Sequence, residues 1–287
     1  MGIFFDDVIT TTKNMGFSDI IEADDDVAMR KRVKDGRYMP EKFMIMAIQK
    51  SAVKIIRLLI DKGADVHSDF LTEAASFGHE DVIRLLMEYM GNLGFAGVYA
   101  LSAAVSNNHL GTAKILVDAG VNIDHHKLTL AVANAIASDY HDVAYFMIES
   151  GVRVTDRLMV YAAAAGNEQM IRYIVSKGAN PSVSLLTPVR HLKVDTIRIL
   201  LECGAVPTDR EWNLLRHDVS VGAKKIIHLF VHHGHMADFV NPYEYIGVMD
   251  ARHLRYLDRY DEMRRIIKHR DGMRKRMLSY PSDVDLV

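Results

Sequence analysis

The chain has 287 residues, of which 49% are hydrophobic and 25% are charged, and its formal net charge is −2. This composition is that of a folded globular protein and excludes an intrinsically disordered chain. A charge so close to zero provides no global field that would attract nucleic acid or acidic lipid. Only six prolines occur and no tract is rich in serine and glycine, so we predict one continuous body without a flexible linker.

The chain opens with an acidic segment, residues 1–36, whose first part carries seven acidic residues against Lys13 alone, a balance of −6. The run Asp24-Asp25-Asp26 resembles a carboxylate cluster, but no second set of ligands accompanies it. Such a run more often caps a helix and faces solvent. The stretch AMRKRVKDG at 28–36 has poor apolar positions, so we predict a degenerate, polar capping repeat at this end.

The best-formed predicted element is a helical hairpin at residues 70–91, FLTEAASFGHEDVIRLLMEYMG. Its first helix, 71–77, carries the small residue Ala74, which lets a second backbone approach closely. Gly78 ends that helix because glycine tolerates a positive φ. The second helix, 82–89, has the apolar spacing of a one-faced helix, at Val82, Leu85, Leu86 and Tyr89. Such a hairpin cannot bury its apolar face alone, which predicts similar hairpins stacked on both sides.

The ending of this hairpin, an apolar run followed by glycine, recurs along the chain. The terminal glycines are Gly63, Gly91, Gly120, Gly151, Gly178, Gly204 and Gly234. Their spacings by subtraction are 28, 29, 31, 27, 26 and 30 residues. In the first helices, small residues recur in register at Ala47, Ala74, Ala104, Ala135 and Ala162. The turns align at Gly78-His79, Asn108-His109, Gly166-Asn167 and Gly222-Ala223, where glycine or asparagine suits a left-handed C-cap.

The pattern x-A-A-x-x-G-H-x-x-V-x-x-L-L-x-x-G-A-D, carried by EAASFGHEDVIRLLMEYMG and IIRLLIDKGADV, resembles the ankyrin repeat. The resemblance covers roughly residues 40–237 and implies an all-α solenoid of stacked helix-turn-helix units with projecting finger loops. Units of 26–31 residues are shorter than the usual length of about 33, which predicts trimmed finger loops. The family's Thr-Pro-Leu-His opening survives only at Thr187–Arg190, where Pro188 predicts a short or displaced first helix.

These features divide the chain into an acidic N-terminal capping repeat (1–36), an array of about seven repeats (37–240) and a divergent C-terminal cap and tail (241–287). The last part is basic, because residues 252–276 hold ten bases and four acids, a balance of +6. The bases that form this candidate contact surface are Arg252, Arg255, Arg259, Arg264, Arg265, Lys268 and Arg270.

Motifs for catalysis do not stand out in the sequence. We find no G-x-S-x-G, no phosphate-binding glycine loop and no paired cysteines, and we predict neither an enzyme nor a cofactor. The histidines near Gly234 include an i, i+4 pair that is compatible with a metal, but histidine before this glycine also suits a helix C-terminus. We predict no metal. The histidines concerned are His228, His232, His233 and His235.

The single cysteine, Cys203, excludes an intramolecular disulfide and fits a reducing compartment. It stands in an apolar run, where a buried small side chain is the usual interpretation and a reactive thiol is the alternative. The N-terminus lacks the features of a secretion signal, and no apolar run approaches the roughly 20 residues of a membrane helix. We therefore expect a cytoplasmic or otherwise intracellular location and no membrane contact.

In stacked repeats, the fingers and the exposed face of each first helix add up to one long groove. Phe77 and Trp212 attract notice because aromatic residues make good interface anchors, although Trp212 suits packing against a neighbouring repeat better. The residues that the register places in this groove are His67, Asp69, Glu73, Phe77, Ser106, Asn107, Asp124, His125, His126, Arg153, Asp156, Arg157, Asp209 and Arg210.

The sequence therefore predicts a scaffold that binds another protein, of unknown identity, through its groove and fingers. Short repeats of this kind are similar to those of viruses, phages and intracellular bacteria, which adds the hypothesis of an inhibitor or effector acting on a host defence or signalling protein. Two alternatives remain open. The basic C-terminal cap is compatible with nucleic acid, and the oppositely charged ends are compatible with head-to-tail self-association.

Overall fold

The computed structural model describes residues 16–32, 41–218, 220–235 and 237. These residues form helices and no strand, which confirms the predicted all-α class. They belong to two compact units: unit 1 extends to Ala165, and unit 2 begins at Gly166. The boundaries predicted at 36/37 and 240/241, and the whole basic cap, lie outside the described residues.

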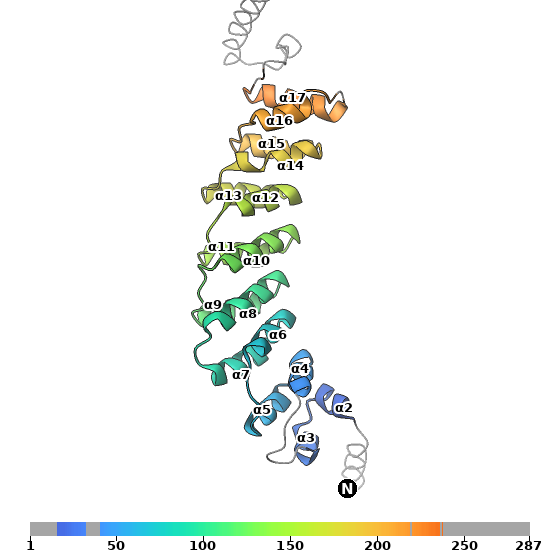
Figure 1. Cartoon of the computed structure of the whole chain (residues 1–287), viewed down its shortest axis with the longest axis vertical. Helices are drawn as coiled ribbons and strands as arrows, with labels where there is room; N and C mark the ends of the chain where they lie inside the picture. The colour runs from blue at the N-terminus through green and yellow to red at the C-terminus, as the bar shows by residue number, and fades with distance from the viewer. Residues whose placement is uncertain (1–15, 33–40, 219, 236, 238–287) are drawn as a thin grey trace, which may run out of the picture. The chain divides into compact units, whose positions relative to one another are not determined.

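Unit 1 consists of helices that come in successive pairs (Figure 1). They are α2 (Phe17–Glu22), α3 (Asp26–Arg32), α4 (Glu41–Gln49), α5 (Val53–Asp61), α6 (Ser68–Phe77), α7 (Glu80–Met90), α8 (Gly94–Ser106), α9 (Leu110–Asp118), α10 (His126–Ala137), α11 (His141–Glu149) and α12 (Asp156–Ala165). The first helices of the pairs pack on one another in the order α2, α4, α6, α8, α10, α12, and the second helices in the order α3, α5, α7, α9, α11. The result is a two-layered stack.

Unit 2 follows the same plan with less regular elements. Its helices are α13 (Glu168–Ser176), the 3₁₀ helix η1 (Pro181–Ser184), α14 (Leu186–Arg190), α15 (Val194–Glu202), α16 (Asp209–Leu215) and α17 (Val221–His232). Helix α14 packs on α16, and α15 packs on both α13 and α17. The short α14 and the preceding 3₁₀ turn confirm the prediction for Pro188, because proline removes an amide donor and clashes with the preceding turn of an α-helix.

The core lies between the two helix layers and between successive pairs. All five aligned alanines of the first helices are fully buried, as the pattern predicts. In α7, the buried face consists of Val82, Ile83, Leu85 and Leu86. The prediction that Tyr89 belongs to this face is wrong: the residue is 43% exposed and lies in the last turn of α7, which ends at Met90.

The terminal glycines end the second helices as predicted. All seven have a positive φ, between 64° at Gly91 and 112° at Gly151. A left-handed residue at this position lets the chain leave the helix while its last carbonyl groups remain hydrogen-bonded, and glycine adopts this conformation without steric cost.

The turns within the pairs also contain a residue of positive φ, and Gly78, Asn108 and Gly166 confirm the alignment there. In other helix pairs, the turn residue with a positive φ was not predicted from the sequence. These residues are Asp24, Ser51, Asp139 and Leu192. The prediction for Gly222 is wrong, because this residue lies within α17, whose N-cap is Ser220. The physical reason is packing: a Cβ at Gly222 would lie 3.0 Å from Leu192 Cδ1, so glycine makes room for that leucine.

Histidines at the turns join neighbouring repeats of unit 1. Nε2 of His79 lies 3.1 Å from the carbonyl oxygen of Gln49, and Nε2 of His109 lies 2.9 Å from that of Ser76. Each ring nitrogen donates to a carbonyl at the C-terminal end of the preceding first helix, where the helix itself supplies no donor. The Gly-His and Asn-His dipeptides of the sequence therefore combine a left-handed turn with a hydrogen bond between repeats.

Asp24 makes a similar connection at the N-terminal end. Its carboxylate accepts hydrogen bonds from the backbone amides of Lys54 (3.3 Å) and Ile55 (3.0 Å) at the start of α5. Its neighbour Asp25 accepts from Ala28 in α3 (2.9 Å), and Asp26 pairs with Arg30 (3.2 Å). The acidic run thus caps helices, as the sequence indicates, but one of its members caps a helix of the next pair.

We expect Asp24→Gly to lower the free energy of unfolding by about 1 kcal/mol, because α5 loses its capping acceptor. Glycine suits the φ of 47° at this position, so the substitution isolates the cap from backbone strain. Urea unfolding measures the change in stability, and hydrogen exchange at the amides of residues 54 and 55 localises it. Asp24→Asn retains an acceptor oxygen and serves as the control. Equal stability of the glycine variant and the wild type would contradict the capping role.

In the part of the chain that the structure describes, no helix combines the length and the apolar character needed to cross a membrane.

Candidate protein-binding surface

Finger loops and first helices in the middle of unit 1 bring several predicted binding residues together. Asp124 and His125 belong to the loop between α9 and α10, and His126 begins α10. Arg153 belongs to the next loop, between α11 and α12, and Arg157 lies in the first turn of α12. These five residues line one hollow of about 670 Å³, together with Thr129 and the exposed Leu130 of α10.

Aromatic side chains extend this hollow onto α8. Phe95, which is 73% exposed, lies edge-on to the ring of His125 with a centroid distance of 6.1 Å. His125 in turn lies 4.4 Å from the ring of His126. One turn along α8, Tyr99 is 47% exposed and carries the ammonium group of Lys127 over its ring at 4.3 Å. We call this set, Phe95, Tyr99, Asp124, His125, His126, Leu130, Arg153 and Arg157, the finger surface.

Local interactions hold the finger surface in place. The guanidinium of Arg153 donates to both carboxylate oxygens of Asp124 at 3.0 Å, which ties two successive fingers together. Nδ1 of His125 accepts from the backbone amide of Lys127 at 3.2 Å and so caps α10. Exposed ion pairs contribute at most about 1 kcal/mol to stability, so the Arg153–Asp124 pair serves to position the fingers more than to stabilise the fold.

Two basic side chains, Lys127 beside the finger surface and Arg157 within it, lie at positions where their charge does not favour folding. Lys127 lies in the first turn of α10, which contains no acidic residue, and Arg157 lies in the first turn of α12, next to Asp156. The N-terminus of a helix carries a partial positive charge, which disfavours cations there by about 0.3–1 kcal/mol each. Arg157 makes no ion pair with any residue that the structure describes. Its guanidinium is therefore available to a ligand.

Other residues predicted for the groove lie elsewhere. Phe77, Ser106 and Asn107 lie at the C-terminal ends of α6 and α8, the ends opposite the fingers, and Phe77 stacks on His79 at 5.7 Å. His67, the N-cap of α6, contacts Phe70. Within α6, Asp69 is exposed in the first turn, and Glu73 accepts a hydrogen bond from Gln49 at 2.8 Å. Asp156, next to Arg157, is exposed.

Asp209 and Arg210 belong to unit 2, where they are exposed in the first turn of α16 behind the N-cap Thr208. Trp212 of the same helix is buried edge-on against Phe230 at 5.0 Å, which confirms packing rather than binding.

Phe95, Tyr99 and Leu130 were not predicted from the sequence. The available signal was the i, i+4 pair of aromatic residues in GFAGVYALSAAVS, a helix otherwise made of small and aliphatic residues. Two large aromatic side chains one turn apart lie on the same face of a helix. That face is solvent-exposed here, although the apolar character of the whole helix suggests complete burial.

The described part of unit 2 contains the histidines near Gly234 and the cysteine that the sequence singles out. Burial, and then the adjacent His232, lower the pKa of His233, whose ring lies 5.3 Å from that of His232. Burial also raises the pKa of the Cys203 thiol, which reduces its thiolate fraction and favours the interpretation as an inert packing residue. Among the described residues, no group of three or more histidine, cysteine, aspartate or glutamate side chains is placed to hold a metal ion.

Comparison with known proteins agrees with this architecture. The family model described as "Ankyrin repeats (3 copies)" matches residues 43–127 and, in a second alignment, residues 71–157. Residues 43–157 therefore consist of ankyrin repeats. The two matches include the helices and fingers that form the finger surface, so this surface is part of an ankyrin repeat array.

Among solved structures, the ankyrin repeat domain of human ASB11 is similar to this chain. The two are 19% identical, the alignment covers 58% of this chain and 85% of that domain, and the TM-score is 0.49. No curated protein matches the sequence. Ankyrin repeats generally mediate protein–protein interactions, and proteins built from them are typically non-enzymatic scaffolds.

Proposed function

We propose that this chain is a binding protein, not an enzyme, and that it holds a partner protein on the finger surface of unit 1. The observation that carries the proposal is a continuous set of exposed aromatic, imidazole and guanidinium groups drawn from three successive repeats. Aromatic residues and arginine are the side chains that most often dominate the energy of protein interfaces. Their positions are fixed by helices and by the Arg153–Asp124 pair, so binding orders little of the chain.

The proposed mechanism is occupancy. A rigid surface that covers part of a partner blocks or positions it without any chemical step. Inhibition of a host defence or signalling protein is one form of this mechanism, and the short repeats of the sequence support it. An inhibitor and a scaffold would use the same finger surface. The identity of the partner protein therefore determines which of the two roles the chain has.

Site-specific photocrosslinking tests the proposal. A photoreactive amino acid replaces Tyr99 or Leu130 on the finger surface, and in control variants it replaces Arg84 or Asp118, which are exposed on the second helices α7 and α9. In cells that naturally make the protein, we expect one crosslinked partner protein at the first two positions and none at the controls. Adducts at the control positions alone, or at all four positions equally, would refute the proposal.

The same variants separate the alternatives. Nucleic acid association through the basic cap predicts steeply salt-dependent binding to DNA or RNA that is unaffected by changes at Tyr99 and Leu130. Head-to-tail assembly predicts oligomers that dissociate in high salt, visible by size-exclusion chromatography with light scattering, and crosslinks to a second copy of the chain.

A further inference from the structure

The connection between α7 and α8 is shorter than the other fingers of unit 1. It spans residues 91–93, whereas the comparable connections span 62–67, 119–125 and 150–155. Helix α8 is correspondingly long, with 13 residues from Gly94 to Ser106. A positive φ at Gly94 and a hydrogen bond from its amide to Asn92 Oδ1 (3.0 Å) turn the chain directly into this helix. The sequence therefore replaces a finger with an additional turn of helix.

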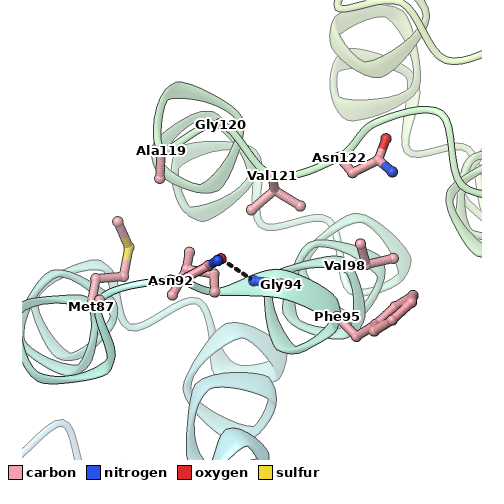
Figure 2. Close-up of a pocket in the computed structure, with 11 residues that line it drawn as sticks. Met87, Asn92, Gly94, Phe95, Val98, Ala119, Gly120, Val121 and Asn122 are labelled. Carbon is pink, nitrogen blue, oxygen red and sulfur yellow. Dashed lines mark hydrogen bonds between the residues drawn. The ribbon is translucent and has the colours of Figure 1, made fainter.

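The missing finger leaves a pocket of about 500 Å³ between this connection and the loop after α9 (Figure 2). Its apolar lining includes Met87, Phe95, Val98 and Val121. In Figure 2, the side chain of Val121 points from the loop after α9 toward α8. A pocket of this size accommodates a large aliphatic or aromatic side chain of a partner, in keeping with the usual volume of small ligand sites.

The pocket adjoins the hollow of the finger surface, and we call the two together the groove. Asn122 lines the pocket, and the next residue along the chain, Ile123, lines the hollow. The ring contact between Phe95 and His125 spans the two. An apolar depression therefore adjoins a polar one that presents Arg157 and two histidines. Asp124, the acidic residue of the lining, already accepts two hydrogen bonds from Arg153.

We propose that this groove binds an extended, acidic peptide segment of the partner protein, with a large apolar side chain in the pocket beside Phe95 and a carboxylate on Arg157. The inference rests on the proposed function and specifies the chemistry of the partner. Charge complementarity supports an acidic occupant, since Arg157 lacks an ion pair within the described residues while Asp124 is neutralised by Arg153. Guanidinium groups bind carboxylates through paired hydrogen bonds, which adds directional selectivity.

Selection of peptides by the purified full-length chain tests this inference. A displayed library of random linear peptides is selected at physiological salt, and the enriched sequences are synthesised and measured by fluorescence anisotropy. We expect enriched peptides that combine aspartate or glutamate with leucine, isoleucine, methionine or an aromatic residue. Replacing their acidic residues by the corresponding amides should weaken binding about tenfold, as expected for a charged anchor at an interface.

Matched variants locate the site. Arg157→Glu and Phe95→Ala should each weaken binding of the enriched peptides about tenfold. Their controls are Arg84→Glu, which makes the same change, and Tyr89→Ala, which also replaces an aromatic residue by alanine; both lie at exposed positions of α7 and should leave binding unchanged. Arg157→Glu should not disturb folding, because an acidic residue is favourable in the first turn of a helix.

Three results would overturn the inference: enriched peptides without acidic residues, acidic peptides that bind the Arg157 and Phe95 variants as tightly as the wild type, and no enrichment at all. Self-association that Arg157→Glu abolishes would also overturn it, by identifying a second copy of the chain as the occupant. A partner that crosslinks at Tyr99 and Leu130 in spite of such a result would leave the proposed function intact.

Discussion

Replacing Ala135 by leucine is expected to lower the free energy of unfolding by about 1–3 kcal/mol, through overpacking. Ala135 is fully buried on α10, and this helix packs against α8, α11 and α12. The neighbouring Val132 and Ile136 are also fully buried, so the additional methyl groups find no free volume. Alanine and leucine have nearly equal helix propensities, so packing accounts for the expected loss.

Ala137→Leu provides the control, because it makes the same substitution two residues further along α10, where the side chain is exposed. Its effect on stability should lie within about 0.5 kcal/mol of zero. Urea unfolding followed by circular dichroism measures both variants. Similar stabilities of the two would show that the helix layers of unit 1 do not need a small residue at position 135.

Gly78→Ala is expected to destabilise the chain more than Gly120→Ala does, although both glycines have nearly the same φ, 74° and 78°. A left-handed alanine costs about 1–2 kcal/mol at either position. Only Gly78 has a close neighbour: a Cβ there would lie 2.4 Å from Nδ1 of His109, whereas nothing lies within 4 Å at Gly120. The displaced His109 would lose its hydrogen bond to Ser76, which adds about 1 kcal/mol.

A double-mutant cycle with His109→Ala separates the two contributions. Once the ring is absent, Gly78→Ala should cost no more than Gly120→Ala, which leaves a coupling energy of about 1 kcal/mol between residues 78 and 109. Urea unfolding of the four variants measures this energy. Strict additivity would show that the backbone conformation alone requires glycine at position 78 and that His109 tolerates a neighbouring side chain.

The repeat pattern was predictable because its physical causes are local in sequence. Glycine after the second helix is required by backbone conformation and occurs in all seven copies, and alanine within the first helix is required by close approach and occurs in the first five. The finger surface was only partly predictable. Asp124, His125, His126, Arg153 and Arg157 follow from the register, since each finger stands at the same place in its repeat.

The sequence by itself determined the helical class, the repeat register, the glycine ends of the second helices and the fingers that carry polar groups. Only the tertiary structure decided which groups meet. Asp24 caps a helix that begins about thirty residues later, and Leu192 takes the space that Gly222 leaves. Phe95 reaches His125 because the connection at residues 91–93 is too short to form a finger. The physical reason is distance along the chain: conformational preferences act within a few residues, whereas these contacts join different repeats.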